Sequence, residues 1–299
     1  MCPQFAPGPR RYVAGLPQPS RCLVMGVLNV TPDSFSDGGR WLDPQLAVKH
    51  GRELVREGAD LVDVGGESTR PGAVRPSASE ELDRVVPVIA ALATEGMLVS
   101  VDTMRSDVAA AALESGATLV NDVSGGRADP RMFEVVAAAG APYVLMHWRA
   151  HSQRMQDHTE YDDVVTDVRA ELREQLDQAV AAGIAAERIA LDPGIGFSKT
   201  TAQNWRVLGA LEELASLGQP LLVAASRKRF LGELLANEAG ELRPALQRDE
   251  ATTATSALAA VSGAWCIRSH SVRGTADAVR VAARWAQDSP QGSAGDPRR

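Results

Sequence analysis

The chain has 299 residues, a formal net charge of −7 and 44% hydrophobic residues, enough to bury a large core within a single domain. The acidic balance argues against generic nucleic-acid binding, which usually needs a basic surface. No apolar run approaches the roughly 20 residues of a membrane-spanning helix, and Pro and Gly interrupt the N-terminus where a signal peptide would be apolar.

The ends and the cysteines give two further expectations. Residues 1–20 are rich in Pro, Gly and Arg, and residues 288–299 in Ser, Pro, Gly and charge, so both are expected to be irregular, poorly ordered tails around one domain over 21–287. Cys2, Cys22 and Cys266 show neither metal-ligand spacing nor a disulfide framework. A reduced, cytoplasmic setting follows.

Apolar runs and amphipathic segments alternate from the start of the domain. The run over 22–28 is nearly continuous, as in a strand covered on both faces, and a turn-rich loop over 29–39 leads to a helix over 44–57. A second strand over 61–64 and a loop over 65–72 precede a helix over 79–94, for which Ser79 is the expected cap.

The alternation continues to the end of the domain and predicts a (β/α)8 TIM barrel. A doubly wound open sheet is the alternative, but it usually has fewer units, and no G-x-G-x-x-G follows the first strand. The remaining expected strands cover 98–101, 118–120, 143–146, 188–191, 220–225 and 264–267, and the remaining expected helices cover 106–114, a segment from near 130, 161–182, 201–217, 230–235, 248–261 and 274–287.

Polar residues end the expected strands. In a TIM barrel these strand ends meet around one mouth, where active sites lie. Any one such residue is compatible with a cap or turn, but so many polar groups are costly to bury without a ligand or mutual pairing. In chain order they are Asn29, Asp63, Asp102, Asn121, His147, Asp192, Lys228, Arg268 and His270.

The chemistry of this set suits a flat, nitrogen-rich heterocycle that carries phosphate. Carboxylate and amide oxygens accept from ring N–H and amino donors, whereas Lys228, Arg268 and His270 can hold anionic oxygens. The cationic segment 226–230 lies at a strand-to-helix junction, which also favours an anion; a solvated surface turn is the alternative. The residues alone therefore predict a barrel for a phosphorylated ligand.

Seven motifs resemble those of dihydropteroate synthase over residues 22–287, and the first two together are highly specific. They are Leu28-Asn-Val-Thr-Pro-Asp-Ser-Phe-Ser-Asp-Gly-Gly39, Asp63-Val-Gly-Gly-Glu-Ser-Thr-Arg-Pro-Gly72, Val101-Asp-Thr103, Val120-Asn-Asp-Val-Ser-Gly-Gly126, Leu191-Asp-Pro-Gly-Ile-Gly-Phe197, Ser226-Arg-Lys-Arg-Phe230 and Arg268-Ser-His270.

The resemblance implies a (β/α)8 barrel of folate biosynthesis that joins 6-hydroxymethyl-7,8-dihydropterin diphosphate to 4-aminobenzoate and releases diphosphate. It also implies Mg²⁺ as cofactor and a homodimer. By matching position, it places Asp102, Asn121, Asp192 and Lys228 on the pterin.

The same resemblance divides the other site residues between the diphosphate, the aminobenzoate and catalysis. Asn29 would bind Mg²⁺. The diphosphate would contact Asn29, Arg70, Arg268 and His270; the aminobenzoate would contact Phe35, Thr69, Pro71 and Arg229; and the catalytic set would be Asp37, Arg70, Lys228, Arg268 and His270. Two positions depart from relatives: Arg229 stands where Ser is frequent, and Ser271 where Asp is common.

Two other functions remain open at this point. One is a pterin-binding barrel that transfers a methyl group from a methylated folate, which explains the Asp and Asn residues but leaves the cations of segments 226–230 and 268–270 without a phosphate to bind. The other is a non-catalytic paralogue that binds pterin and releases no diphosphate.

Overall fold

The computed structural model describes residues 11–31, 43–67, 75–151 and 157–288. Its eight strands are all parallel and form one sheet in the order β6-β5-β4-β3-β2-β1-β8-β7. A parallel bridge between Leu191 and Leu221 joins the two edge strands, so the sheet closes on itself. The predicted (β/α)8 barrel is confirmed. The strands are β1 (Leu23–Asn29), β2 (Leu61–Gly65), β3 (Val99–Asp102), β4 (Leu119–Asp122), β5 (Tyr143–Met146), β6 (Ile189–Asp192), β7 (Leu222–Val223) and β8 (Cys266–Ser269).

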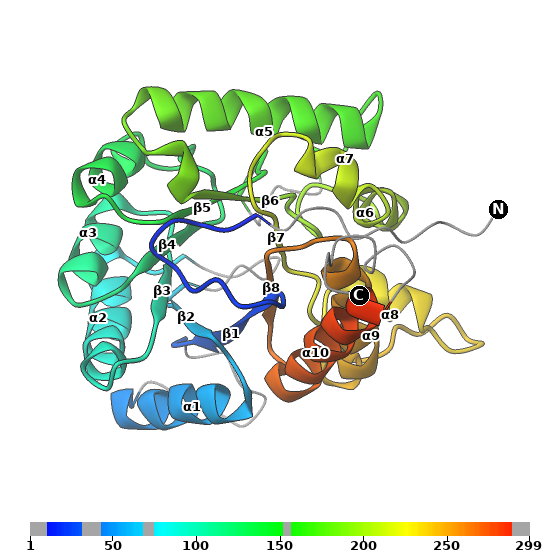
Figure 1. The fold of residues 1–299 in the computed structure, drawn as a ribbon, viewed down its shortest axis with the longest axis horizontal. Helices are drawn as coiled ribbons and strands as arrows, with labels where there is room; N and C mark the ends of the chain where they lie inside the picture. The colour runs from blue at the N-terminus through cyan, green and yellow to red at the C-terminus, as the bar shows by residue number, and fades with distance from the viewer. Residues whose placement is uncertain (1–10, 32–42, 68–74, 152–156, 289–299) are drawn as a thin grey trace, which may run out of the picture.

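The helices surround the barrel in chain order (Figure 1). Among them, none combines the length and apolar character of a membrane span within the described part of the chain. They are α1 (Pro44–Glu57), α2 (Ala78–Thr94), α3 (Ser106–Glu114), α4 (Met132–Ala139), α5 (Val164–Ala181), α6 (Thr201–Leu208), α7 (Leu211–Ala215), α8 (Arg229–Leu234), α9 (Asp249–Val261) and α10 (Val272–Asp288), with short 3₁₀ turns at Ala186–Arg188 and Ala245–Gln247.

Three expected boundaries were wrong. The single helix expected over 201–217 is two helices, because Ala210 leaves the helical region with φ −119° and ψ 25°. The strand expected over 220–225 pairs regularly only at Leu222–Val223. The cap of α2 is Ser77 and not Ser79: the Ser77 hydroxyl accepts from the Glu80 amide, and the Glu80 carboxylate accepts from the Ser77 amide. That Ser-x-x-Glu spacing is a capping box, which Ser79 with Leu82 cannot form.

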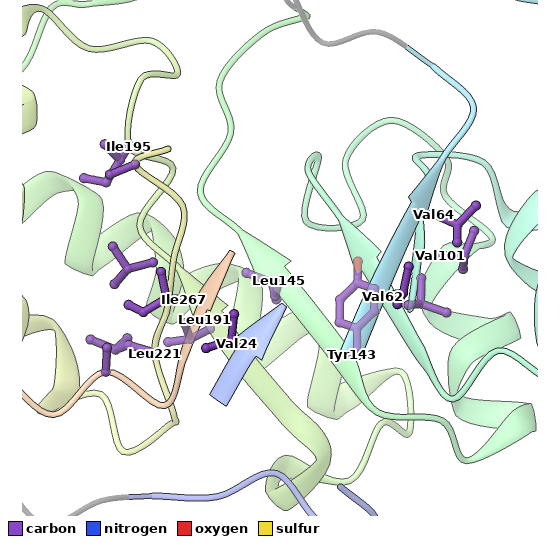
Figure 2. Packing of buried hydrophobic residues seen from close by; sticks show 14 of the residues in the cluster. Val24, Val62, Val64, Val101, Tyr143, Leu145, Leu191, Ile195, Leu221 and Ile267 are labelled. Atoms are coloured by element: carbon purple, nitrogen blue, oxygen red, sulfur yellow. The ribbon is translucent and has the colours of Figure 1, made fainter. Parts of the chain in front are cut away.

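Strand residues alternate between two apolar cores. One core lies between the barrel and its helices, where outward residues such as Val62, Val101 and Leu145 pack (Figure 2). The other contains strand residues of opposite alternation and no helix residue, so it fills the barrel interior. Its strand members are Leu23, Met25, Leu61, Leu119, Val144, Ala190, Leu222 and Cys266.

Residues 11–20 belong to the packed structure, which corrects the expectation of a poorly ordered tail for that part of 1–20. They form neither helix nor strand, but Val13 and Leu16 are buried in the interior core together with Trp265. This segment therefore covers the apolar floor of the barrel. Residues 1–10 and 289–299 of the expected tails lie outside the described residues.

Candidate functional site at the barrel mouth

A polar layer lies above the apolar floor, at the C-terminal ends of the strands. Arg268 of β8 donates from Nε to Asp63 Oδ2 at 2.6 Å and from Nη2 to Asp102 Oδ2 at 2.6 Å. Asn121 of β4 donates from Nδ2 to the same Asp63 oxygen at 3.0 Å. Four strands therefore contribute to one network, and three of its members, Asp102, Asn121 and Arg268, were predicted site residues.

Asp63 is the member whose role was missed in the sequence. The sequence places Asp63 at a polar strand end but indicates no ligand contact for it. In the structure it is fully buried and holds both Asn121 and Arg268. The signal was present: an acidic residue inside the apolar strand Leu61–Gly65 needs a buried partner.

Burial and ion pairing act in opposite directions on these groups. Burial raises the pKa of Asp102 to about 7, although the Arg268 charge opposes it. For Arg268 burial works against the guanidinium charge, but Asp63 and Asp102 outweigh it and raise the pKa. Arg268 therefore stays cationic in a largely buried position, where a fixed charge acts more strongly on an anion than it does in bulk water.

Asp192 and Lys228 form the opposite side of the mouth. Asp192 ends β6 and accepts from the Gly194 amide at 2.7 Å through Oδ1. Lys228, just before α8, donates to the Ile195 carbonyl and lies 4.6 Å from the Phe197 ring centroid. Burial lowers the pKa of Lys228 to about 8, while Asp192 favours the charged form. The pair therefore places an acceptor and a cation beside each other.

The three adjacent cations of segment 226–230 point to different partners. Arg227, with a left-handed φ of 58°, makes a two-bond ion pair with Asp249 of α9 at 2.6 and 2.7 Å. Arg229 pairs with Glu233 within α8 at 2.7 Å, and its side chain is 79% exposed. Only Lys228 of the three turns into the mouth, so the predicted aminobenzoate contact of Arg229 remains a prediction.

An apolar wall lies next to the polar layer. Met104, Val123 and Met146 cluster beyond β3, β4 and β5, and Trp148 and Phe197 pack against them. None of the predicted site residues belongs to this wall. Met146 lies inside the barrel, two residues after the interior Val144. The barrel therefore has an apolar surface as well as polar groups at the ends of its strands.

His147 does not face the mouth, contrary to its prediction as one of the polar strand tips. It follows Met146, so strand alternation turns it outward, where Nε2 lies 2.9 Å from Glu171 of α5 and Nδ1 lies 3.0 Å from Lys199. A list of terminal polar residues does not distinguish the two faces of a strand.

His270 is held by a residue other than its neighbour at 271. Its amide and Nδ1 both lie 3.1 Å from Ser226 Oγ, at the end of the segment after β7. Ser271 bonds instead through its amide to Ser269 Oγ at 3.1 Å. Ser226 therefore orients His270 even though Ser271 stands where relatives commonly have Asp.

Asn29 ends β1 beside Gly65, where a Cβ would lie 3.5 Å from Asn29 Oδ1 and 3.5 Å from Asp102 Oδ2. The glycine thus leaves room next to an amide oxygen, a ligand type that Mg²⁺ accepts. Within the described residues, no three His, Cys, Asp or Glu side chains are grouped to hold a metal. Asn29 fits a Mg²⁺ ion that takes its other ligands from phosphate and water, as this ion commonly does.

The other five predicted site residues, Phe35, Asp37, Thr69, Arg70 and Pro71, fall in 32–42 and 68–74 and lie outside the described residues. The structure therefore describes the predicted pterin and diphosphate residues other than Arg70. Of the aminobenzoate set it describes Arg229.

Comparison with known proteins identifies the class. The family model described as "Pterin binding enzyme" matches residues 25–270, which span all eight strands of the barrel except the first residues of β1. A closed (β/α)8 barrel with carboxylates, an amide and cations at its mouth, together with this match, defines a pterin-binding enzyme.

Comparison with individual proteins identifies the family within this class. The dihydropteroate synthase of Mycobacterium leprae is 56% identical over 269 residues, which cover 90% of this chain and 95% of that protein. A structure of Xanthomonas albilineans dihydropteroate synthase with 4-aminobenzoic acid is 45% identical, covers 90% of this chain and 94% of its own, and has a TM-score of 0.82. A structure of the same enzyme with 7,8-dihydropteroate is 42% identical, covers 94% and 100%, and has a TM-score of 0.81. The chain belongs to the dihydropteroate synthase family.

Proposed function

We propose that this chain condenses 6-hydroxymethyl-7,8-dihydropterin diphosphate with 4-aminobenzoate and gives 7,8-dihydropteroate and diphosphate in folate biosynthesis. The observation that carries the proposal is the mouth itself, where Asp102, Asn121 and Asp192 lie with the cations Lys228 and Arg268. Acceptors for a pterin edge and cations for a leaving diphosphate are thus present in one buried site.

The pterin would lie against Met146 and Phe197, with its N–H groups toward Asp192 and Asn121. Lys228 would donate to the ring. The buried carboxylate of Asp192 would favour positive charge on the pterin methylene carbon as its C–O bond to diphosphate breaks, before the amine attacks. This electrostatic stabilisation acts without a covalent intermediate.

Arg268 and His270 would bind the departing diphosphate. Arg268 is held by Asp63 and Asp102, and His270 by Ser226, so both donors are oriented before substrate arrives. Mg²⁺ bound beside Asn29 would supply further compensation of the diphosphate charge. Neither cysteine of the described residues is a candidate nucleophile, because Cys22 and Cys266 are both buried below the mouth.

The aminobenzoate half of the site is proposed from family resemblance. Phe35 and Pro71 would form apolar walls for the flat ring, Thr69 would also contact it, and Arg229 would lie beside its carboxylate. Asp37 and Arg70 would belong to the catalytic set. The amine is a weak base, so its attack needs no strong general base.

The test is an assay of the purified chain with both substrates, in which 7,8-dihydropteroate and released diphosphate are measured. Both products should form in equal amounts with Mg²⁺ and fall strongly with EDTA. Lys228→Ala should remove turnover and pterin binding together, because the ring loses its cationic donor, while the exposed Lys49→Ala should change neither.

Other outcomes would support the alternatives. Pterin binding without diphosphate release would identify a non-catalytic paralogue. Methyl transfer from a methylated folate, without dihydropteroate, would identify a methyltransferase-like barrel. Retained turnover in Lys228→Ala would contradict the proposed site.

We also propose a homodimer and a cytoplasmic location. Helices α9 and α10 lie side by side (Figure 1). They expose large apolar side chains, with Leu258 of α9 at 56%, Val281 of α10 at 64% and Trp285 of α10 at 71%. Val281 and Trp285 are four residues apart and share one helix face, which supports α9 and α10 as the dimer surface; sedimentation at micromolar concentration should give twice the chain mass. The free thiol of Cys266 supports a reduced compartment.

A further inference from the structure

Lys199 is a buried lysine that the proposed reaction does not use. It lies between β6 and α6 and is 3% exposed. Its ammonium contacts three acceptors: His147 Nδ1 at 3.0 Å, the Gly194 carbonyl at 3.1 Å and the Phe197 carbonyl at 3.2 Å. An ammonium has three N–H donors, so each finds an acceptor.

Two of those acceptors belong to segment 193–198, which connects β6 to Lys199. The backbone of this segment is left-handed at Gly194 (φ 66°), Gly196 (φ 82°) and Ser198 (φ 46°). Such a backbone makes no regular ladder of hydrogen bonds and needs other groups to hold its carbonyls. A Cβ on Gly194 would lie 2.3 Å from the His147 carbonyl oxygen, so the segment also packs tightly against the end of β5.

The same segment also contacts residues of the proposed pterin site. The Gly194 amide bonds Asp192, the Ile195 carbonyl accepts from Lys228, and the Phe197 ring lies beside the Lys228 ammonium. Lys199 and Lys228 therefore bind different carbonyls of one segment. Any shift of that segment moves Lys228 and the ring of Phe197 with it.

The use of lysine here is selective. Of the 31 Lys and Arg residues, only Lys49, Lys199 and Lys228 are lysines. Lys49 is exposed on α1, whereas Lys199 is buried and Lys228 is half-buried, and both contact segment 193–198. A compact ammonium can donate to three converging acceptors, which a planar guanidinium cannot do.

A second set of contacts fixes Lys199 from outside the barrel. His147 accepts from Lys199 through Nδ1, so its proton lies on Nε2 and is donated to Glu171. Glu171 is also held by Arg149 at 3.1 Å. The charged and titratable groups facing Lys199 are thus His147, Arg149, Glu171, Asp192 and Lys228. Burial lowers the pKa of Lys199 to about 7, with Asp192 opposing this.

We propose that Lys199 is a positioning residue for the pterin site, which fixes segment 193–198 so that Asp192, Phe197 and Lys228 keep the arrangement that binds the pterin. The proposal rests on the proposed function for the identity of the ligand. The link between Lys199 and Lys228 is independent of that identity.

Three lysines allow a direct spectroscopic test. The chain labelled with [¹³Cε]-lysine should give three signals, and Lys49→Met and Lys228→Met assign the third to Lys199. In Lys199→Met the Lys228 signal should shift without any ligand. In the parent chain, 6-hydroxymethyl-7,8-dihydropterin diphosphate should shift Lys199 and Lys228 but not Lys49.

Kinetics give the second readout. Lys199→Met should lower kcat/KM for the pterin diphosphate by about 100-fold, the scale of a misplacement near 1 Å, while KM for aminobenzoate changes little. Lys199→Arg should not restore it. Lys49→Met should match the parent.

The outcomes separate the two proposals. A parent chain that forms no dihydropteroate contradicts the proposed function, yet the Lys228 shift in ligand-free Lys199→Met still tests the role of Lys199. An unshifted Lys228 signal with unchanged kinetics overturns the role of Lys199. If Lys199→Met does not fold, a Lys199 signal in the parent chain that is insensitive to the pterin overturns it.

Discussion

Buried side chains at the mouth each make two hydrogen-bond contacts. Asp63 accepts from Asn121 and Arg268 through one oxygen, and Ser226 meets both the amide and the ring of His270. A buried charge is tolerated only when it is paired and hydrogen-bonded. Such shared partners keep the groups that would meet substrate fixed before it binds.

The contacts of Glu171 with His147 and Arg149, outside the barrel, can be tested by changing the pH. Burial acts to raise its pKa, but hydrogen bonds from His147 and Arg149 lower it from 4.5 to about 2. Because the folded-state pKa lies below the unfolded one, this pairing stabilises the fold above about pH 4.5, and the stabilisation is lost as the pH falls toward about 2.

We expect Glu171→Gln to reduce the free energy of unfolding at pH 7 by about 2 kcal/mol, since it loses charged hydrogen bonds. The difference from the parent should narrow at pH 4 and more at pH 3. Urea unfolding at the three pH values measures it, with the exposed Glu174→Gln on the same helix as control. A difference that stays constant from pH 7 to pH 3 would contradict the assignment.

At the residue scale, the sequence predicts which residues end the strands but not the direction in which each side chain points. Asp102, Asn121, Asp192, Lys228 and Arg268 could be predicted because polar groups at strand ends need partners. The outward turn of His147 depends on its place in the alternation of β5, which the sequence leaves uncertain by one residue. The pairing of Arg227 with Asp249 of α9 forms only in the folded chain, whereas the pairing of Arg229 with Glu233 is local to α8.

At the scale of the element, the sequence offers two serines as candidates for the N-terminal cap of α2. Ser77 and Ser79 both precede acidic residues, but only Ser77 has Glu80 at the capping-box spacing. Ser77→Ala should lower the free energy of unfolding by about 1 kcal/mol, whereas Ser79→Ala, inside the helix, should have little effect. Urea unfolding of both variants at pH 7 measures these free energies of unfolding. Equal losses in the two variants would show that the capping box of Ser77 and Glu80 does not stabilise the fold.

The alternation of strands and helices was predictable because each element has its own period of apolar residues. The break at Ala210 was not, since the apolar spacing of 201–217 runs through it unchanged. The shortness of β7 was not predictable from the sequence either. The residues Ala224 and Ala225 after it are buried like strand residues, but they leave the ladder to form the turn that carries Lys228.

At the scale of the whole molecule, the barrel interior is divided into an apolar floor and a polar mouth. Val13 and Leu16 cover the floor, and the network of Asp63, Asp102 and Arg268 lies above it. The net charge of −7 gives no sign of this division. It arises because the parallel strands all end at one rim, so residues far apart in sequence meet there.

The central claim is that the barrel mouth binds a pterin and its diphosphate. The most direct measurement is a crystal structure of the chain with 6-hydroxymethyl-7,8-dihydropterin diphosphate. We expect the ring beside Met146 and Phe197, its N–H edge on Asp192 and Asn121, and the diphosphate at Arg268 and His270. A ligand bound elsewhere, or one at the rim without contact to Asp192 and Lys228, would contradict the account.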